Sequence, residues 1–262
     1  MNAILLAAGV GRRLRPFTDT SPKCLLTVGA RHLLARTLDA LVRAGIERTT
    51  IVVGHCAEQV VSAAGDRWGG MTVAYVSNPN YEEGSIVSLW HAQPMLDADV
   101  LVMDADVLFP AALLERLVRS PHRSCVLLDG RVDGSGEEMI LFAAANRVWN
   151  IIRRGPNETP PPPPGVAAFD TVGESVGFLK LAATDARVLR TIVAQHVAAG
   201  QRGIDHEATY PALFTGCQVG FERVDDLPWT EIDFPGDVAR AGEEIAPLID
   251  ALDANHPGHA TP

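Results

Sequence analysis

The part of the chain best suited to phosphate chemistry lies near its start, where residues 5–26 read LLAAGVGRRLRPFTDTSPKCLL. An apolar run is followed by Gly9 and Gly11, and basic side chains come directly after them. Glycines let backbone amides approach an anion closely, and Arg13 and Lys23 add positive charge. We therefore predict a phosphate-binding loop, while noting that a two-glycine pattern is also typical of an ordinary strand-to-helix turn.

Histidine and cysteine patterns do not indicate a zinc site. The sequence HEATY, beginning at His206, lacks the second histidine of an HExxH motif, and no other histidine pair has ligand spacing. The cysteines show no CxxC spacing and mostly have apolar neighbours, which favours reduced structural thiols. They are Cys24, Cys56, Cys125 and Cys217.

The first hundred residues alternate between two kinds of pattern. Short apolar or β-branched runs predict buried strands at 3–8, 50–53, 73–76 and 100–103. Helical periodicity lies between them, at roughly 33–44, 57–64 and 86–96. This alternation predicts βαβ crossovers, and hence an α/β fold with a Rossmann-like, mainly parallel sheet flanked by helices.

The pattern changes after Asp106. The runs MILFA and VWNII flank AANR as an expected hairpin, and ESVGFLKL predicts another strand, so we expect a mixed sheet in the later half. The segment 155–165, GPNETPPPPPG, is expected to be a flexible surface loop because consecutive prolines remove hydrogen-bond donors. We expect one domain over 1–254 and a frayed tail over 255–262.

Composition narrows the function classes. The chain has 262 residues, 47% hydrophobic content and a formal net charge of −10. Nucleic acids and membrane surfaces both attract positive surface, so neither is an expected partner. The start of the chain carries no charged leader, and no apolar run reaches the roughly 18 residues of a membrane span, which predicts a cytoplasmic protein.

The whole opening string resembles a family signature. An apolar strand, AlaAlaGlyXGlyXArg, ProPheThr and SerProLys followed by LeuLeu are similar to the nucleotidyltransferases that join a nucleoside triphosphate to a phosphorylated sugar or alcohol. Within that family, NPNYEEGSIVSLW at 78–90 looks most like the choline-phosphate and phosphonate cytidylyltransferase branch. Gly84 and Ser85 depart from the paired asparagines of that branch and are similar to sugar-phosphate uridylyl- and thymidylyltransferases instead.

The resemblance implies a pair of metal-binding aspartates. Asp106 and Asp233 stand where the family has them, and carboxylate oxygens suit Mg²⁺, the cofactor we expect. Two alternatives remain open at this point. Asp104 could be the ligand while Asp106 caps a helix, or Asp233 could be a helix cap, although Asp237 is nearer the helix start.

The resemblance also assigns binding residues. The expected nucleotide-binding residues are Leu6, Ala8, Gly9, Gly11, Asn78, Gly84 and Ser85. The expected acceptor-binding residues are Tyr81, Trp90, Arg153, Glu174, Trp229 and Glu231, with Arg154 as an alternative to Arg153 for the acceptor phosphate. Aromatic faces and carboxylates together could recognise a trimethylammonium group, although each aromatic residue taken alone is more typical of core packing.

These residue types fit one reaction. When a phosphate monoester attacks the α-phosphorus of a nucleotide, two anions converge, and charge neutralisation carries the chemistry. Lys23 suits the α-phosphate as a point charge, and the planar fork of Arg13 suits the β and γ oxygens. We expect a Mg²⁺-dependent enzyme that couples CTP to a small phosphorylated amino-alcohol such as phosphocholine. A sugar-1-phosphate uridylyl- or thymidylyltransferase and a non-catalytic nucleotide sensor are the alternatives.

Overall fold

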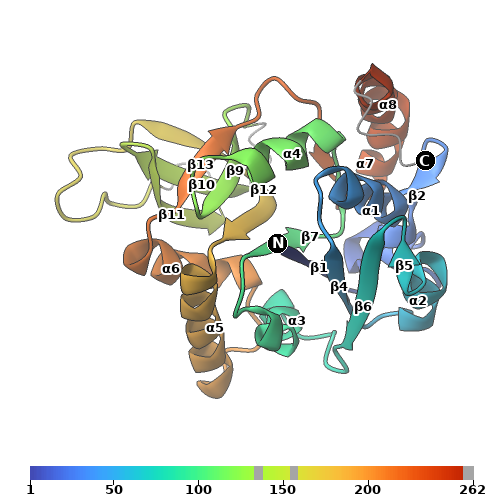
Figure 1. The fold of residues 1–262 in the computed structure, drawn as a ribbon, viewed down its shortest axis with the longest axis horizontal. Coiled ribbons are helices and arrows are strands. Elements are labelled where there is room, and N and C mark those ends of the chain that lie inside the picture. Colours follow the sequence, from blue (N-terminus) through green and yellow to red (C-terminus); the bar gives the residue numbers. More distant parts are fainter. Residues whose placement is uncertain (133–137, 154–158, 256–262) are drawn as a thin grey trace.

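The computed structural model describes residues 1–132, 138–153 and 159–255. Within these residues, one large mixed sheet runs through the molecule with helices on both of its faces (Figure 1). Its path is β11-β10-β12-β7-β1-β4-β6-β5, and β9 joins β12 to β13 beside that path. Arg154, the start of the proline-rich segment at 155–158 and the tail at 256–262 lie outside the described residues.

Four parallel strands form the centre of the sheet. They are β1 (Asn2–Ala7), β4 (Arg48–Val53), β6 (Met71–Ser77) and β7 (Val100–Asp104). Strand β1 lies between β7 and β4, and both pairings are parallel. The predicted strands and the predicted fold class are confirmed. The sequence could predict them because a sheet covered on both faces requires strands with nearly continuous apolar runs.

The later strands are mostly antiparallel. They are β9 (Cys125–Asp129), β10 (Met139–Ala144), β11 (Arg147–Arg153), β12 (Thr171–Leu181) and β13 (Gly220–Arg223). The predicted hairpin joins β10 to β11, and its two turn residues, Ala145 and Asn146, both have positive φ. Such a turn matches the twist of the flanking strands. Short β5 (Arg67–Trp68) pairs with β6 at the other edge.

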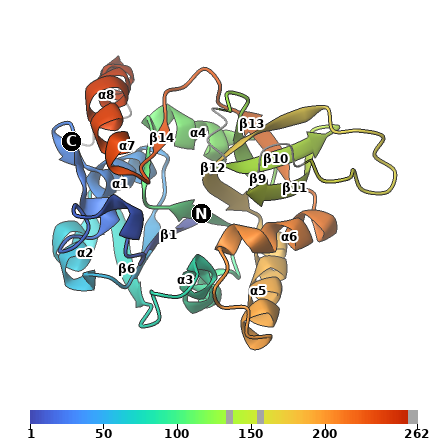
Figure 2. The ribbon, with the colours of Figure 1, turned by 180° about the vertical axis from the view of Figure 1, so that it is seen from behind.

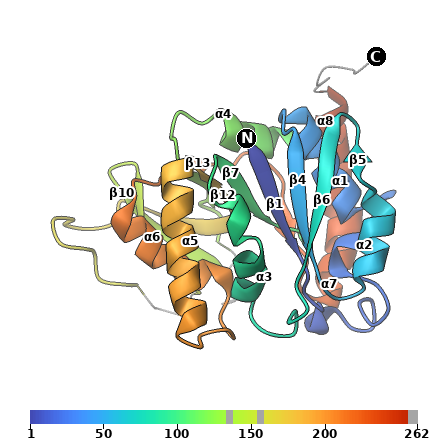
Figure 3. The same ribbon diagram turned by 60° about the horizontal axis from the view of Figure 1, so that its bottom comes forward.

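The longer helices divide between the two faces of the sheet. One face packs against α1 (Leu33–Arg43), α2 (Ala57–Ala64) and α4 (Ala111–Arg119). The opposite face packs against α3 (Ser85–His91), α5 (Ala183–Ala198) and α6 (Tyr210–Gly216), as Figure 3 shows. Alternate residues of β1 serve the two cores, since Leu5 belongs to the first and Ile4 to the second.

The helix expected over 86–96 is shorter than predicted. It ends at His91, and a separate 3₁₀ turn, η3 (Gln93–Met95), follows. Pro94 lies in that turn, and a proline disfavours helical geometry in the residue before it. The described residues 159–165 of the proline-rich segment form no helix or strand, in agreement with the prediction. Among the described residues, no helix is both long and apolar enough to cross a membrane.

The C-terminal segment returns to the N-terminal half of the molecule (Figure 2). Strand β14 (Thr230–Glu231) pairs with β8 (Val107–Leu108), and α7 (Pro235–Arg240), a π-helical turn η5 (Ala241–Ile245) and α8 (Ala246–Asn255) follow. Their apolar residues form a third core cluster with Leu14 and Leu33. This docking brings the residues around 231–233 beside the loop that follows β1.

Smaller elements complete the N-terminal loop. The 3₁₀ turns η1 (Arg12–Leu14) and η2 (Lys23–Leu25) are followed by a ribbon of β2 (Thr27–Val28) and β3 (Arg31–His32). Gly11 adopts a left-handed conformation at φ +64°, and its carbonyl accepts a hydrogen bond from Thr18 Oγ1 at 2.7 Å. The loop therefore folds back on itself and places Lys23 close to Gly11.

Candidate active site

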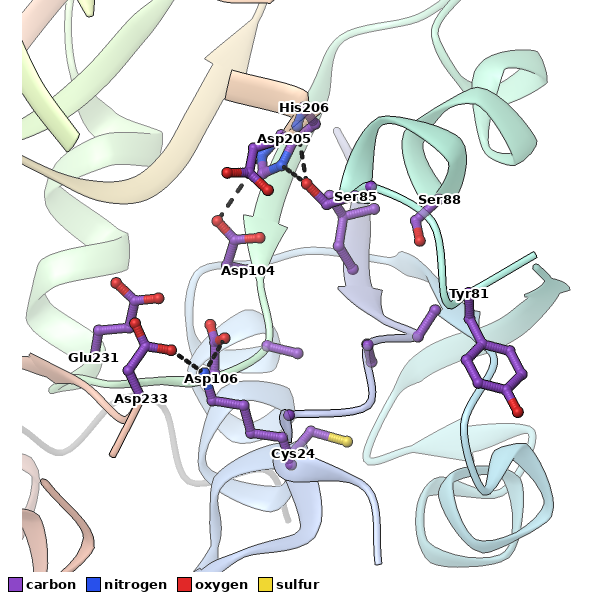
Figure 4. A pocket seen from close by; sticks show the side chains of 18 of the residues that line it. Cys24, Tyr81, Ser85, Ser88, Asp104, Asp106, Asp205, His206, Glu231 and Asp233 are labelled. Atoms are coloured by element: carbon purple, nitrogen blue, oxygen red, sulfur yellow. Dashed lines mark hydrogen bonds and ion pairs between the residues drawn. The ribbon is translucent and has the colours of Figure 1, made fainter. Parts of the chain in front are cut away.

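A cleft of about 370 Å³ opens at the carboxyl ends of β1 and β7 (Figure 4). Open parallel sheets bind ligands at this edge, because strand ends and helix starts converge there. The glycine loop, the first turn of α3, the residues after β7 and the C-terminal segment all contribute to its lining. Another 3₁₀ turn, η4 (His206–Thr209), forms part of the wall.

Three carboxylates meet on one side of the cleft. Asp106, Glu231 and Asp233 each offer an oxygen, and these oxygens lie within 4.8 Å of one another. Asp106 also has a buried oxygen, Oδ1, without a hydrogen-bond partner among the described residues. A set of hard oxygen donors with one unsatisfied buried oxygen suits a divalent cation such as Mg²⁺. Glu231, expected from the sequence to bind the acceptor, thus lies with the two predicted metal ligands.

Backbone pairing explains how the three carboxylates come together. Glu231 is the register partner of Val107, and the amide of Ile232 donates to the carbonyl of Asp106 at 3.2 Å. The same segment also decides against the alternative in which Asp233 caps the helix that follows it. Asp237 Oδ2 accepts hydrogen bonds from the amides of Asp233 and Phe234, so Asp237 is the capping residue and the Asp233 side chain faces the cleft.

Lys23 lies at the centre of this group. Its Nζ contacts Asp106 Oδ2 and Asp233 Oδ1, each at 2.7 Å. Burial alone would lower the pKa of Lys23, but the two carboxylates raise it above its usual value, so the ammonium stays charged. Arg13 contacts the other oxygen of Asp233 at 2.9 Å and stacks over the Phe234 ring at 5.0 Å. Two cations thus face the carboxylates from the glycine loop.

Most of the residues predicted to bind nucleotide line the cleft. These are Leu6, Ala8, Gly9, Gly11, Gly84 and Ser85. Asn78 does not line it. Asn78 is buried, its Nδ2 donates to Ser88 Oγ at 3.0 Å, and its Oδ1 accepts from the amide of Asn80. Asn78 therefore fixes the turn before α3, and its neighbour Ser88 lies on the cleft wall instead.

The residues predicted to bind the acceptor are divided between two spaces. Tyr81 lies across the cleft from Glu231 (Figure 4). Trp229 and Glu174 line an adjoining cavity of about 460 Å³, where the Trp229 indole donates to Asp129 Oδ2 at 2.7 Å. Glu231 and Asp233 line both spaces. The expected aromatic enclosure from Tyr81 and Trp229 is therefore absent from the described residues.

Two other residues predicted to bind the acceptor, Trp90 and Arg153, lie in different places. Trp90, a residue of α3, lines neither space and packs partly buried against the core, with its ring edge-on to His91 at 4.9 Å. Residues of an amphipathic helix often pack inward in this way, and the role of Trp90 as an acceptor contact stays a prediction. Arg153 does line the cleft, where its guanidinium pairs with Asp205 at 3.1 Å.

Sequence reasoning missed a buried polar chain on the opposite wall. Ser85 Oγ accepts from the amide of His206 at 2.9 Å and lies 3.1 Å from His206 Nδ1. Burial lowers the pKa of His206 to about 4, so the ring is neutral at pH 7. The ring tautomer decides which of Ser85 Oγ and Nδ1 donates, and the other ring nitrogen, Nε2, lies 3.8 Å from Asp104 Oδ2. Asp104 is thus turned toward His206, away from the three-carboxylate group.

Gly84 holds α3 against the segment that carries His206. Its amide donates to the carbonyl of Arg202 at 2.8 Å, and a Cβ atom at this position would lie 2.1 Å from the carbonyl oxygen of Ile204. We expect Gly84→Ala to lower the free energy of unfolding by about 1–3 kcal/mol, because two backbones would have to separate. Gly203→Ala is the matched control, since a Cβ atom there would meet nothing within 4 Å and we expect a change under ~0.5 kcal/mol. Equal urea midpoints for the two variants would contradict the prediction.

The buried carboxyl group of Glu207 makes the free energy of unfolding depend on pH. Burial, helped by Asp205, raises the pKa of Glu207 to about 7 from 4.5. Between these values the folded protein keeps a proton that the unfolded chain releases, so the folded state loses stability as pH rises, and the full cost is present above pH 7. We expect Glu207→Gln to raise the free energy of unfolding at pH 8 by about 1–3 kcal/mol and to change it little at pH 4. Urea unfolding at both values measures this, and an equal effect at pH 4 and pH 8 would contradict it.

The fold and the site together define a class. A parallel βαβ half, a glycine loop with Arg13 and Lys23, and facing carboxylates at the sheet edge are the features of a nucleotidyltransferase. Comparison with known proteins agrees, because residues 3–157 match the family described as the MobA-like NTP transferase domain. The chain belongs to this family, which confirms the resemblance found in the sequence.

Relatives with described activities are similar over different lengths. CMP-5'-(3-aminopropyl)phosphonate synthase of Streptomyces rubellomurinus is 30% identical over 255 residues, which are 94% of this chain and 39% of that protein. The 2-aminoethylphosphonate cytidylyltransferase of Lancefieldella rimae is 34% identical over 133 residues, which are 47% of this chain and 49% of that protein. The chain therefore spans less than half the length of these two relatives.

A solved structure has the same fold. The CTP:phosphocholine cytidylyltransferase of Streptococcus pneumoniae superimposes with a TM-score of 0.71 at 23% identity. The match covers 92% of this chain and 97% of that one. The similarity therefore extends beyond the parallel half to the mixed later strands and the C-terminal segment that carries Asp233.

Proposed function

We propose that this chain is a Mg²⁺-dependent cytidylyltransferase. Its acceptor would carry a phosphate or phosphonate at one end and a cationic nitrogen at the other, the class that includes phosphocholine. The observation that carries the proposal is the joining of Lys23 to Asp106 and Asp233, with Glu231 beside them, at the edge of the sheet that faces the glycine loop. Charge neutralisation at one point is what the meeting of two phosphate anions requires.

In the proposed reaction an acceptor oxygen attacks the α-phosphorus of CTP, a new P–O bond forms, and the bond to the β-phosphate breaks to release pyrophosphate. Arg13 and Lys23 would hold the phosphates in line for this displacement. A divalent cation held by Asp106, Glu231 and Asp233 would neutralise negative charge on the substrate phosphates. The buried Asp106 oxygen without a partner supports this assignment.

Two observations support the choice of base and acceptor. The relatives named above are a CMP-aminopropylphosphonate synthase and an aminoethylphosphonate cytidylyltransferase, which favours CTP and a nitrogen-bearing acceptor. Carboxylates also outnumber basic side chains among the described residues that line the cleft, where Glu83, Asp104, Asp106, Asp205, Glu207, Glu231 and Asp233 lie with Arg12, Arg13, Lys23 and Arg153. Such an excess of negative charge favours a cationic tail.

A substrate matrix tests the proposal. Four nucleoside triphosphates would be combined with phosphocholine, phosphoethanolamine, 2-aminoethylphosphonate, glycerol 3-phosphate and glucose 1-phosphate, with and without Mg²⁺. We expect pyrophosphate release with CTP and the nitrogen-bearing acceptors, and none after chelation of Mg²⁺. Preferred turnover of glucose 1-phosphate with UTP or dTTP would replace the proposal with a sugar-phosphate nucleotidyltransferase.

A further inference from the structure

A small recess extends from the cleft beside the three-carboxylate group. It has a volume of about 40 Å³ and lies between β7, β12 and the turn η4. Its described lining includes four carboxylates, from Asp104, Glu207, Glu231 and Asp233, together with Ser175 and Arg153. Arg153 is paired with Asp205, and Asp233 with Arg13 and Lys23, so Asp104, Glu207 and Glu231 remain to meet a ligand. A recess of this character is suited to a positively charged group.

Glu207 is the buried member of this lining. Its side chain is 8% exposed, and its Oε1 receives one long contact, from Ser175 Oγ at 3.5 Å. No hydrogen bond among the described residues reaches its Oε2. A buried carboxylate without full hydrogen bonding is costly unless a cation or donor meets it. Glu207 therefore has the capacity to accept a hydrogen bond from a ligand in the recess.

Backbone geometry holds Asp104 in the same lining. Gly177 of β12 has a left-handed conformation at φ +81°, in a stretch where the pairing of β12 with β9 shifts register. A Cβ atom at Gly177 would lie 2.8 Å from Asp104 Oδ2, so only glycine leaves room for this carboxylate. Two acidic side chains from separate elements, Asp104 and Glu207, are thus both fixed at the recess.

The size of the recess selects among cations. Its volume of about 40 Å³ compares with about 370 Å³ for the whole cleft, so the recess takes a small group. A trimethylammonium head is larger, donates no hydrogen bonds and is recognised by aromatic faces. The described residues that line the recess include no aromatic side chain. A primary ammonium, with three donors, matches the available carboxylate and hydroxyl oxygens.

We infer that the recess is the binding site for a primary ammonium group of the acceptor, held by Glu207 and Asp104. This inference rests on the proposed function and narrows it to acceptors with a phosphate or phosphonate and an unmethylated amine on a short linker. Because Glu231 and Asp233 line both the cleft and the recess, an ammonium in the recess lies next to the place where the acceptor phosphate would react. Phosphocholine is then a poor acceptor.

A comparison of acceptors tests this selection. We expect the wild-type kcat/KM to be at least ~30-fold higher for phosphoethanolamine or 2-aminoethylphosphonate than for phosphocholine. Glu207→Gln should raise KM for the two primary amines ~10- to 100-fold, with KM for CTP changed less than ~3-fold, because a charge-assisted hydrogen bond is lost. Glu222→Gln, which removes a carboxylate that lines neither the cleft nor the recess, should leave both KM values unchanged.

A second variant distinguishes a change in acceptor selection from simple loss of structure. Met139 lines the recess, so Met139→Ala should enlarge it and raise kcat/KM for phosphocholine relative to phosphoethanolamine. Equal use of the two acceptors by the wild-type enzyme, or an equal loss for glycerol 3-phosphate in Glu207→Gln, would overturn the inference.

A binding measurement separates this inference from the proposed function. If no acceptor yields pyrophosphate, the proposed function fails. Calorimetric binding of 2-aminoethylphosphonate to the protein would still support the recess if it weakens at least ~10-fold in Glu207→Gln. Undetectable binding in the wild-type protein, or unchanged binding in the variant, would overturn it.

Discussion

Replacing Lys23 by alanine should lower kcat at least ~100-fold, a loss of about 3 kcal/mol in transition-state stabilisation. Its ammonium is the cation shared by Asp106 and Asp233, and it stays charged at every working pH because the two carboxylates raise its pKa. In the proposed reaction this charge strengthens its contacts as the two phosphates converge. Steady-state pyrophosphate release at saturating CTP, acceptor and Mg²⁺ measures the effect.

Two controls accompany this variant. Arg119→Ala removes an exposed cation from α4 and should keep the full rate, since its guanidinium pairs with Glu115 outside the cleft. Thermal unfolding should show that Lys23→Ala remains folded. A Lys23→Ala enzyme with more than half the normal kcat would remove this lysine from the mechanism.

Substituting asparagine for Asp106 or Asp233 should nearly abolish turnover while the fold is kept. Asparagine preserves the shape and removes the charge on which a hard cation depends, so higher Mg²⁺ concentrations should be needed for any remaining activity. The double variant should be little worse than either single one, because residues that serve one ion act as a unit. Rates measured over a Mg²⁺ titration, with circular dichroism as the folding control, test this expectation.

The double-variant comparison is the decisive part of that experiment. The carboxylate oxygens of Asp106 and Asp233 lie within 4.8 Å of each other and both contact Lys23, so independent action is not expected. Losses that simply add in free energy would contradict a shared site. Asp129→Asn is a useful comparison, because its carboxylate binds the Trp229 indole in the adjoining cavity and is not one of the three carboxylates.

The sequence by itself determined the parallel half of the fold and the chemistry of the loop after β1. Strands β1, β4, β6 and β7 are near-continuous apolar runs, and helices α1 and α2 show clear periodicity, so local pattern and final structure agree. Lys23 and Arg13 follow the glycines closely along the chain. Their place at the sheet edge follows from the end of the first strand.

Only the tertiary structure decided which distant residues meet. Glu231 joins Asp106 through the pairing of β14 with β8, and Ser85 contacts His206 from 121 residues away. Two-residue strands carry no periodic signal, and His206 lacks a partner at ligand spacing in the sequence. Pairings of this kind depend on how α8 and the segment after α5 pack, which no local pattern encodes.

The residues predicted to bind the acceptor show most clearly what the sequence alone leaves undetermined. Tyr81 and Trp229 have the residue types of an enclosure for a quaternary cation, yet they line different spaces. The Trp229 indole is turned toward Asp129 by its hydrogen bond, and the Tyr81 side chain packs against Gly54. Residue type specifies what a side chain can bind, whereas the packing of β12, β14 and η4 decides that Glu207 and Asp104, and no aromatic ring, face the small recess.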